Sequence, residues 1–432
     1  MDEQTTTFLE YETRALLARL ARIKPFALQE AMLPAADISP AAANAIERQL
    51  SSVRRRVRHD AERFLFWLHG PSGRAATPAD AQRRFTFLRL RFGTALNQFD
   101  MFADVLTQRS ERDTGVWLRG LDVIASDALA LPGFYDVPPV VCYLDRGVGA
   151  AIRRARTRLP GGGLNPVAII RVPRERMVGT SIASSLVHEV GHQAAALLDL
   201  VRSLRLTLQS RVTGEPLDPW AYWVRWISEI VADFWSVARV GICSTLGLMG
   251  VVSLPRPFVF RIGPGDPHPF PWIRVNLSCA MGQLLYPHPQ WARIAALWSS
   301  FYPPRELPLE QRLLLDALVG SMPEFVSLLA THQSSALRGR TLASVMELQH
   351  RNPDHLAARF QAWRADPAQM YREQPSIVFA ALGQARADGV LDAREESALL
   401  SKLLTHWALS STLETAARCA PLSAALTPVP VT

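Results

Sequence analysis

Two histidines four residues apart, with a glutamate directly after the first, form the segment HEVGH from His188 to His192. On an α-helix this spacing brings both imidazoles to one face about one turn apart, where they can share a tetrahedral metal ion. Glu189 points to the flank of that face. Its carboxylate could hold a metal-bound water and accept its proton as the water attacks a carbonyl. The segment predicts a hydrolytic metal site, provided that the chain supplies a third ligand.

The next predicted helix offers that ligand in the segment SEIVADFW. Glu229 is the best candidate for the third ligand, with Asp199 and His268 as rivals. Asp233 follows Glu229 by one turn and could accept a hydrogen bond from the free ring N–H of a ligand histidine, which fixes the tautomer of that ring. The tryptophans and phenylalanine around Asp233 favour burial of its carboxylate together with a partner.

HEVGH followed by EIVAD (229–233) resembles the gluzincins, the thermolysin-like and neprilysin-like superfamily of zinc metallopeptidases, over about residues 137–275. The resemblance implies Zn²⁺ as the cofactor, with His188, His192 and Glu229 as its ligands. It also implies Glu189 as the general base and Asp233 as the hydrogen-bond partner of a ligand histidine. The strand before the motif helix, VAIIRV, is then a sheet edge to which an extended peptide or protein substrate adds.

Gluzincins stabilise the developing oxyanion with a downstream histidine or tyrosine. The segment DPHPFPWIRV offers His268 as this catalytic donor, six residues before Arg274. Tyr222, Tyr286 and His288 are alternatives.

The resulting hypothesis is a metalloprotease, a zinc-dependent hydrolase of peptide bonds. One alternative is an effector or toxin-type zinc protease that acts on one specific protein. Another is a zinc-containing scaffold that binds a protein, but a purely structural site has no use for a base at Glu189.

The elements that must position these residues follow from apolar periodicity and turn signals. Helices are predicted through the first 130 or so residues, including one that begins at Ser39-Pro40 and stops at Gly70. VVCYLD and VAIIRV predict strands, and GAAIRRARTRL between them predicts a helix with an arginine face. The motif helix begins at Thr180 or Ser181 and runs on through AAALLDLVRSL, and Asp218-Pro219 begins the next helix. The proline-dense stretch 253–275 is expected to be extended or turning.

These elements predict an α+β, predominantly helical fold. An N-terminal helical domain (1–132) would precede a zincin-like domain (133–300) that contains a small mixed sheet and the active-site helix. A C-terminal helical region (301–420) and a flexible tail (421–432) would follow.

The composition argues against several other classes of protein. The net charge of +8 comes almost wholly from arginine, since Lys24 and Lys402 are the only lysines. With abundant alanine, leucine and proline this indicates the codon bias of a GC-rich bacterial genome rather than a nucleic-acid partner. Gly161–Gly163 lack the Gly-Lys-Ser/Thr of a phosphate loop. The segment QARADGVLDAREE partly resembles a calcium-binding loop, but it has Gln384 and Arg386 at the first and third ligand positions. We therefore do not expect calcium binding there.

Location is predicted from the cysteines and the apolar stretches. Cys142, Cys243, Cys279 and Cys419 are far apart and predict buried free thiols in a reducing compartment. The first residues lack the basic stretch and following apolar stretch of a secretory signal peptide. The least polar stretch (240–255) is too short for a membrane span. We therefore expect a cytoplasmic protein without a membrane span.

Overall fold

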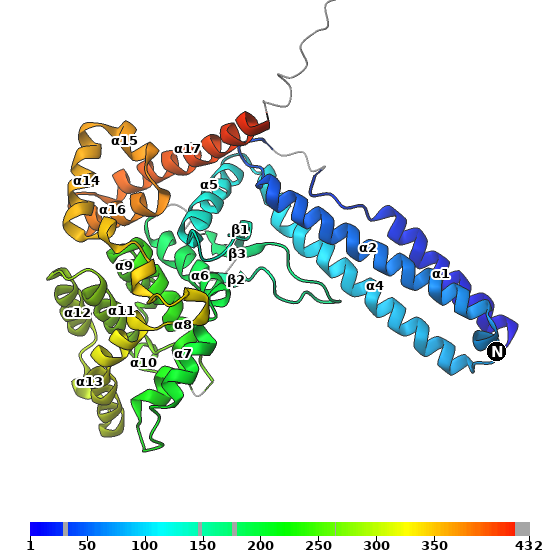
Figure 1. Cartoon of the computed structure of the whole chain (residues 1–432), viewed down its shortest axis with the longest axis horizontal. Helices are drawn as coiled ribbons and strands as arrows, with labels where there is room; N and C mark the ends of the chain where they lie inside the picture. The colour runs from blue at the N-terminus through cyan, green and yellow to red at the C-terminus, as the bar shows by residue number, and fades with distance from the viewer. Residues whose placement is uncertain (29–32, 146–148, 175–178, 264, 420–432) are drawn as a thin grey trace, which may run out of the picture. The chain divides into compact units, whose positions relative to one another are not determined.

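A computed structural model describes residues 1–432 except 29–32, 146–148, 175–178, 264 and 420–432 (Figure 1). The predicted tail at 421–432 therefore lies outside the described residues. The chain divides into two compact units: unit 1 contains 1–116, 138–143 and 153–169, and unit 2 contains 117–137, 144–152 and 170–432. Helices dominate, with one small mixed three-stranded sheet, which confirms the α+β, predominantly helical class. The domain boundaries expected after residues 132 and 300 stay predictions.

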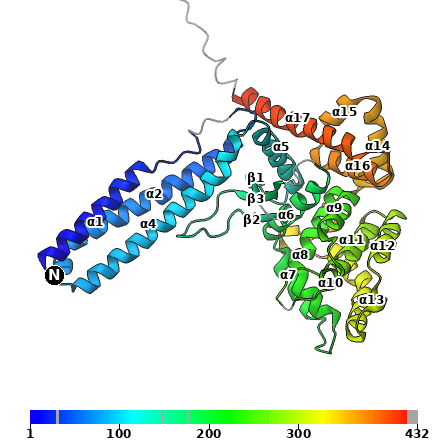
Figure 2. The same cartoon turned by 180° about the vertical axis from the view of Figure 1, so that it is seen from behind.

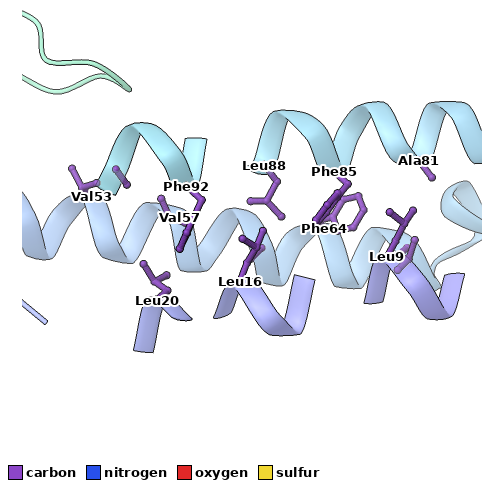
Figure 3. Packing of buried hydrophobic residues seen from close by; sticks show 13 residues of the cluster. Leu9, Leu16, Leu20, Val53, Val57, Phe64, Ala81, Phe85, Leu88 and Phe92 are labelled. Atoms are coloured by element: carbon purple, nitrogen blue, oxygen red, sulfur yellow. The ribbon is translucent and has the colours of Figure 1, made fainter. Parts of the chain in front are cut away.

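Three long helices of unit 1 lie side by side in both views of the molecule (Figures 1 and 2). They are α1 (Glu3–Arg22), α2 (Pro40–His69) and α4 (Pro78–Thr107). The short α3 (Pro71–Arg74) lies between α2 and α4, and η1 (Gln108–Ser110) follows α4. As predicted, the Ser39 side chain caps the start of α2 by accepting from the Ala42 N–H, and Gly70 ends that helix. Buried side chains at helical spacing meet between the three helices (Figure 3). They include Leu9 and Leu16 of α1, Val57 and Phe64 of α2, and Phe85 and Phe92 of α4.

The sheet consists of β1 (Val140–Asp145), β2 (Ala151–Arg153) and β3 (Ala168–Pro173), in the order β1-β3-β2. VVCYLD and VAIIRV are therefore strands, as predicted. The expectation that VAIIRV is a sheet edge is wrong, because β3 lies between β1 and β2. Strand order depends on contacts between distant segments, which the local pattern of VAIIRV does not record.

The predicted helix in GAAIRRARTRL is also wrong. Its first residues form β2, and the rest belongs to an irregular hairpin of unit 1 that turns through Gly161–Gly163. The Arg156 N–H donates to the Asn165 carbonyl at 2.8 Å, and the Asn165 N–H donates to the Thr157 carbonyl at 2.8 Å. Pairing with a distant segment overrides the helical spacing of the arginines in this stretch.

Unit 2 is built almost wholly of helices (Figure 1). In chain order, α5 to α11 are α5 (Arg112–Leu129, of which 117–129 belong to this unit), α6 (Ser181–Leu197), α7 (Leu200–Gln209), α8 (Pro219–Val240), α9 (Ile242–Val252), α10 (Arg256–Val259) and α11 (Pro271–Leu285). The others are α12 (Gln290–Phe301), α13 (Leu309–Thr331), α14 (Pro353–Ala365), α15 (Pro367–Arg372), α16 (Pro375–Ala387) and α17 (Ala393–Cys419). Short 3-10 turns link them: η3 (Pro304–Glu306), η4 (Ser335–Leu337), η5 (Ala343–Val345) and η6 (Leu348–Arg351).

Two predicted boundaries in unit 2 need correction. The motif helix does not run on through AAALLDLVRSL, because Asp199 adopts a left-handed conformation (φ 52°) and separates α6 from α7. The proline-dense stretch is not extended throughout, since it contains α10 and the first turn of α11. Pro271 fits the first position of α11, because the backbone N–H that proline lacks would have no partner within the helix at that position. Asp218-Pro219 begins α8 as predicted.

The apolar stretch at 240–255 forms the buried helix α9, too short to span a bilayer. Helix α13 is long and apolar enough to cross a membrane by length and composition, and 44% of its apolar window is buried inside the protein. A core helix of a soluble protein passes the same test. Length and composition of α13 therefore favour neither environment.

Three of the predicted free thiols are observed: Cys142, Cys243 and Cys279 are buried and form no disulfide. Burial raises the pKa of Cys243 to about 12 and that of Cys279 to about 12, so both thiols stay protonated at neutral pH. The side chain of Cys419 is not among those described.

Candidate metal centre

Helices α6 and α8 pack closely, and the glycine of HEVGH allows their approach. A Cβ added at Gly191 would lie 2.8 Å from the Cα and the carbonyl oxygen of Ala232 on α8, closer than side chains approach backbone. Helix α8 is almost wholly buried from Glu229 onward, which fixes its position against α6. The two histidines of α6 are thereby brought opposite Glu229.

The start of α6 is held by a carboxylate from the C-terminal helix α17. The Thr180 N–H donates to Glu396 at 3.1 Å, and the Thr180 hydroxyl donates to the same oxygen. Arg386 of α16 donates in turn to the Thr180 hydroxyl at 3.3 Å. A carboxylate at this end satisfies a free helix N–H and interacts favourably with the helix dipole. Thr180, one of the two residues predicted to begin the motif helix, is the N-cap of α6, but its own side chain makes no capping hydrogen bond.

Three ligand atoms converge between α6 and α8. An oxygen of Glu229 lies 3.2 Å from Nε2 of His188 and 3.4 Å from Nε2 of His192. One atom from each of the three residues lies within 4.8 Å of the other two, so this buried group could hold a metal ion. The ligand set expected from the sequence is thus brought together.

Asp233 contacts the opposite nitrogen of His188. Nδ1–H of His188 donates to Asp233 at 2.8 Å, which leaves Nε2 to face Glu229. Arg274 of α11 binds the same carboxylate through two hydrogen bonds, of 2.7 Å from Nε and 2.9 Å from Nη2. The sequence reasoning placed Arg274 near His268 but missed its pairing with Asp233.

The charges of the site shift several pKa values. Burial opposes charge on His188, but the Asp233 carboxylate outweighs it and raises the pKa of His188 to about 9. Burial also opposes ionisation of Glu229, yet hydrogen bonds from His188, His192 and His268 lower the pKa of this carboxyl well below its usual range. The pKa of Asp233 is lowered too, because Arg274 and His188 outweigh the effect of burial. Both carboxyls are therefore ionised at neutral pH.

Glu189 lies beside the three converging atoms and has no hydrogen-bond partner among the described residues. It lines a cavity of about 160 Å³ together with His188, Asp233, His268 and Arg274. Burial raises the pKa of the Glu189 carboxyl, and the neighbouring histidines only partly offset this effect. A carboxylate on a buried residue, with a raised pKa and no hydrogen-bond partner in the part of the chain that the structure describes, is suited to accept a proton.

His268 reaches the site from the loop before α11. Its Nε2 lies 3.2 Å from the Glu229 carboxylate, and its side chain is 46% exposed. Asp266 accepts from both the backbone N–H and Nδ1 of His268, each at 2.9 Å. The hydrogen bond that His268 donates to Glu229 is the largest cause of the raised pKa of His268, and the Asp266 carboxylate raises it further. The sequence reasoning missed Asp266. An aspartate whose side chain accepts from the backbone N–H two residues later is nevertheless a recurrent turn pattern.

The alternative residues lie elsewhere, and none lines this cavity. Asp199 pairs with Arg202 at 2.5 Å. The Tyr286 hydroxyl donates to the Ala238 carbonyl at 2.5 Å, and the Tyr222 ring packs 5.3 Å from the Trp226 ring. His288 lies 3.8 Å from the Asp354 carboxylate.

No protein-family model, curated protein or solved structure matches this chain. Inferences about its function therefore rest on the geometry of these side chains.

Proposed function

We propose that this protein is a zinc-dependent metallopeptidase of the gluzincin type. The observation that carries the proposal is the convergence of His188, His192 and Glu229 beside Glu189, a buried carboxylate without a hydrogen-bond partner among the described residues. A structural metal site has no need of such a carboxylate, whereas hydrolysis requires one.

The donor set fits zinc. Zinc ligands lie about 2.0–2.2 Å from the ion, so two ligands of a tetrahedral site are roughly 3.4 Å apart. The Glu229 oxygen is 3.2 Å and 3.4 Å from the two imidazole nitrogens. His188, His192 and Glu229 would hold the ion, with both imidazoles neutral once it binds, and three protein ligands are the number that catalytic zinc sites use. Asp233 supports the ligand role of His188, because its hydrogen bond fixes the ring with Nε2 toward the site.

Zinc, when bound, supplies a Lewis acid that polarises a carbonyl and lowers the pKa of water. The chain supplies the proton transfers. Glu189 accepts a proton from the water that attacks the peptide carbonyl carbon, and it then donates a proton to the leaving amine as the C–N bond breaks. The raised pKa of Glu189 supports this role, since it brings the carboxyl closer to the operating pH.

In this proposal His268 stabilises the negative charge that develops on the carbonyl oxygen. Asp266 bonds Nδ1, which orients Nε2 toward the site and favours the protonated ring. A cationic N–H beside the scissile carbonyl strengthens as a hydrogen-bond donor when the oxygen becomes anionic.

An extended substrate has a strand to pair with beside the cavity. Gly149 and Ala150, directly before β2, line the cavity, and β2 is an edge strand of the described sheet. We therefore assign the substrate-pairing edge to β2 rather than to β3.

Glu189→Gln tests the proposal. The amide keeps the volume of the side chain and leaves the three ligands intact, but it cannot take a proton from water. We expect one zinc per chain and unchanged thermal stability. Hydrolysis of a quenched fluorescent peptide library should fall roughly 10²- to 10⁴-fold.

Glu62→Gln, the same chemical change on the exposed face of α2, serves as the matched control and should leave hydrolysis unchanged. Retention of more than about a tenth of wild-type kcat by zinc-loaded Glu189→Gln would exclude Glu189 as the base. Wild-type protein that does not bind zinc would exclude the function altogether.

A further inference from the structure

A groove runs along the α2–α4 pair in unit 1, on a face to which α1 contributes no lining residue. It has a volume of about 560 Å³, and Phe64 and Leu88 form its floor. We call it the α2–α4 groove. Its walls and rims are formed by Arg63, Phe66 and Trp67 of α2 and by Arg84, Phe87 and Arg91 of α4.

The rims of this groove carry large apolar side chains in water. Phe66 is 83% exposed and Phe87 is 61% exposed, one on each helix. Leu90, next to the groove on α4, is 59% exposed. A contiguous exposed aromatic surface of this kind marks a site that another apolar surface covers.

The charged side chains of the groove favour a binding partner of opposite charge. Asp60 is the single carboxylate in the lining, and Arg91 pairs with it at 2.8 Å. The Arg84 guanidinium lies over the Trp67 ring, 4.4 Å from its centroid. Arg63 makes no hydrogen bond or ion pair within the described part of the chain. Arg84 interacts electrostatically with Asp80, which lies one turn earlier on α4 and outside the lining. The lining thus holds three arginines and one carboxylate, and an occupant with carboxylates would pair with this excess of positive charge.

We propose that the α2–α4 groove binds an acidic amphipathic helix of a partner protein. Such a helix would place apolar side chains between Phe66 and Phe87 and carboxylates beside Arg63 and Arg84. It would lie against two antiparallel helices and complete a four-helix arrangement with α1, α2 and α4. A second copy of the same face would oppose arginine to arginine, so the charges disfavour self-pairing. This inference is independent of the metal centre, which lies in unit 2.

The probe is a fluorescein-labelled synthetic helix of about 18 residues, with leucine on one face and glutamate on the others. Its binding to the full-length protein is measured by fluorescence anisotropy. The same peptide with lysine for glutamate is the charge control. We expect saturable binding of the glutamate peptide, at least about tenfold tighter than that of the lysine peptide and weakened by salt.

Variants locate the binding. Phe87→Ser and the double variant Arg63→Glu/Arg84→Glu should each raise the Kd at least about tenfold. Arg89→Glu, an exposed arginine of α4 outside the groove, and Phe301→Ser on α12 should leave the Kd unchanged. Far-UV circular dichroism confirms that each variant is folded.

Three outcomes would overturn the proposal. The first is a glutamate peptide that does not bind or whose binding ignores the groove variants. The second is that the wild-type protein sediments with phosphatidylcholine–phosphatidylglycerol vesicles and the Phe87→Ser variant does not. This result would identify the groove as a membrane-binding surface. The third is a dimer in analytical ultracentrifugation that Phe87→Ser dissociates, which would assign the face to self-association.

Discussion

The proposed function gives single residues at the candidate metal centre distinct roles that can be tested separately. Glu229 contacts both candidate ligand histidines. Of these two histidines Asp233 contacts only His188, at Nδ1, and Glu189 forms a hydrogen bond to neither within the described chain. Substituting each carboxylate by its amide should therefore change a different measurable quantity: metal affinity, proton affinity or turnover.

Glu229→Gln should weaken zinc binding. A neutral amide oxygen is a poorer zinc ligand than a carboxylate, and the ionised state of Glu229 is the one that its histidine neighbours stabilise. We expect the zinc Kd to rise by at least about 10²-fold, measured by competition with a chromogenic chelator, with Glu62→Gln unchanged. An unchanged zinc Kd in Glu229→Gln would show that Glu229 is not a zinc ligand and that another residue has this role.

Asp233 should control how the stability of the metal-stripped protein depends on pH. The folded-state pKa of His188 is raised from 6.5 to about 9, so the protonated ring stabilises the fold fully below pH 6.5. That contribution disappears as the pH rises through about 9. The free energy of unfolding in chelator should therefore fall between these two pH values.

In Asp233→Asn the carboxylate that contributes most to raising the pKa of His188 is absent, whereas burial still lowers that pKa and the hydrogen bond with Glu229 still raises it. Urea unfolding should then show a smaller decline in stability between pH 6.5 and 9 than the wild-type protein shows. Zinc should remove the decline in the wild-type protein, since a ligand imidazole is neutral. A decline in Asp233→Asn as large as that of the wild-type protein would assign it to another group.

At the scale of elements, the α6–α8 contact brings the three candidate ligands together, and Gly191 allows the close approach of the two helices. Gly191→Ala would press a Cβ into the backbone of Ala232 and force the two helices apart. We expect a loss of about 1–3 kcal/mol of stability from overpacking, together with weaker zinc binding.

Gly250→Ala is the matched control, because an added Cβ on α9 meets nothing within 4 Å. Alanine is the better helix former there, so stability should be unchanged or rise by up to about 1 kcal/mol. Equal effects of the two substitutions on zinc affinity would argue against a specific role of the α6–α8 contact.

The sequence predicts the helices of the site better than the sheet beside it. Helical period places His188 and His192 on one face, and Glu229 and Asp233 one turn apart, without any long-range information. The order β1-β3-β2, the strand at 151–153 and the pairing of Arg274 with Asp233 depend on contacts between segments far apart in the chain. No local pattern records such contacts, so these features could not be predicted.

At the scale of the whole molecule, each compact unit carries its own feature: an apolar three-helix bundle with the α2–α4 groove in unit 1, and the candidate metal centre in unit 2. A metal ion stabilises only the part of the chain whose folding assembles its ligands. Damage to the bundle core should therefore lower stability without changing the affinity of the metal centre.

Phe85→Ala tests this separation. Phe85 is buried between the helices of the bundle, with its ring 6.0 Å from that of Phe64 (Figure 3). Truncation removes a large apolar side chain and leaves a cavity, which should cost about 3–5 kcal/mol of stability in the bundle. The zinc Kd, measured below the unfolding transition, should stay within about threefold of the wild-type value, because sites without shared contacts behave independently. A shift of tenfold or more would show that folding of the bundle is coupled to assembly of the metal centre, so that α1, α2 and α4 contribute to binding the ion despite supplying none of its ligands.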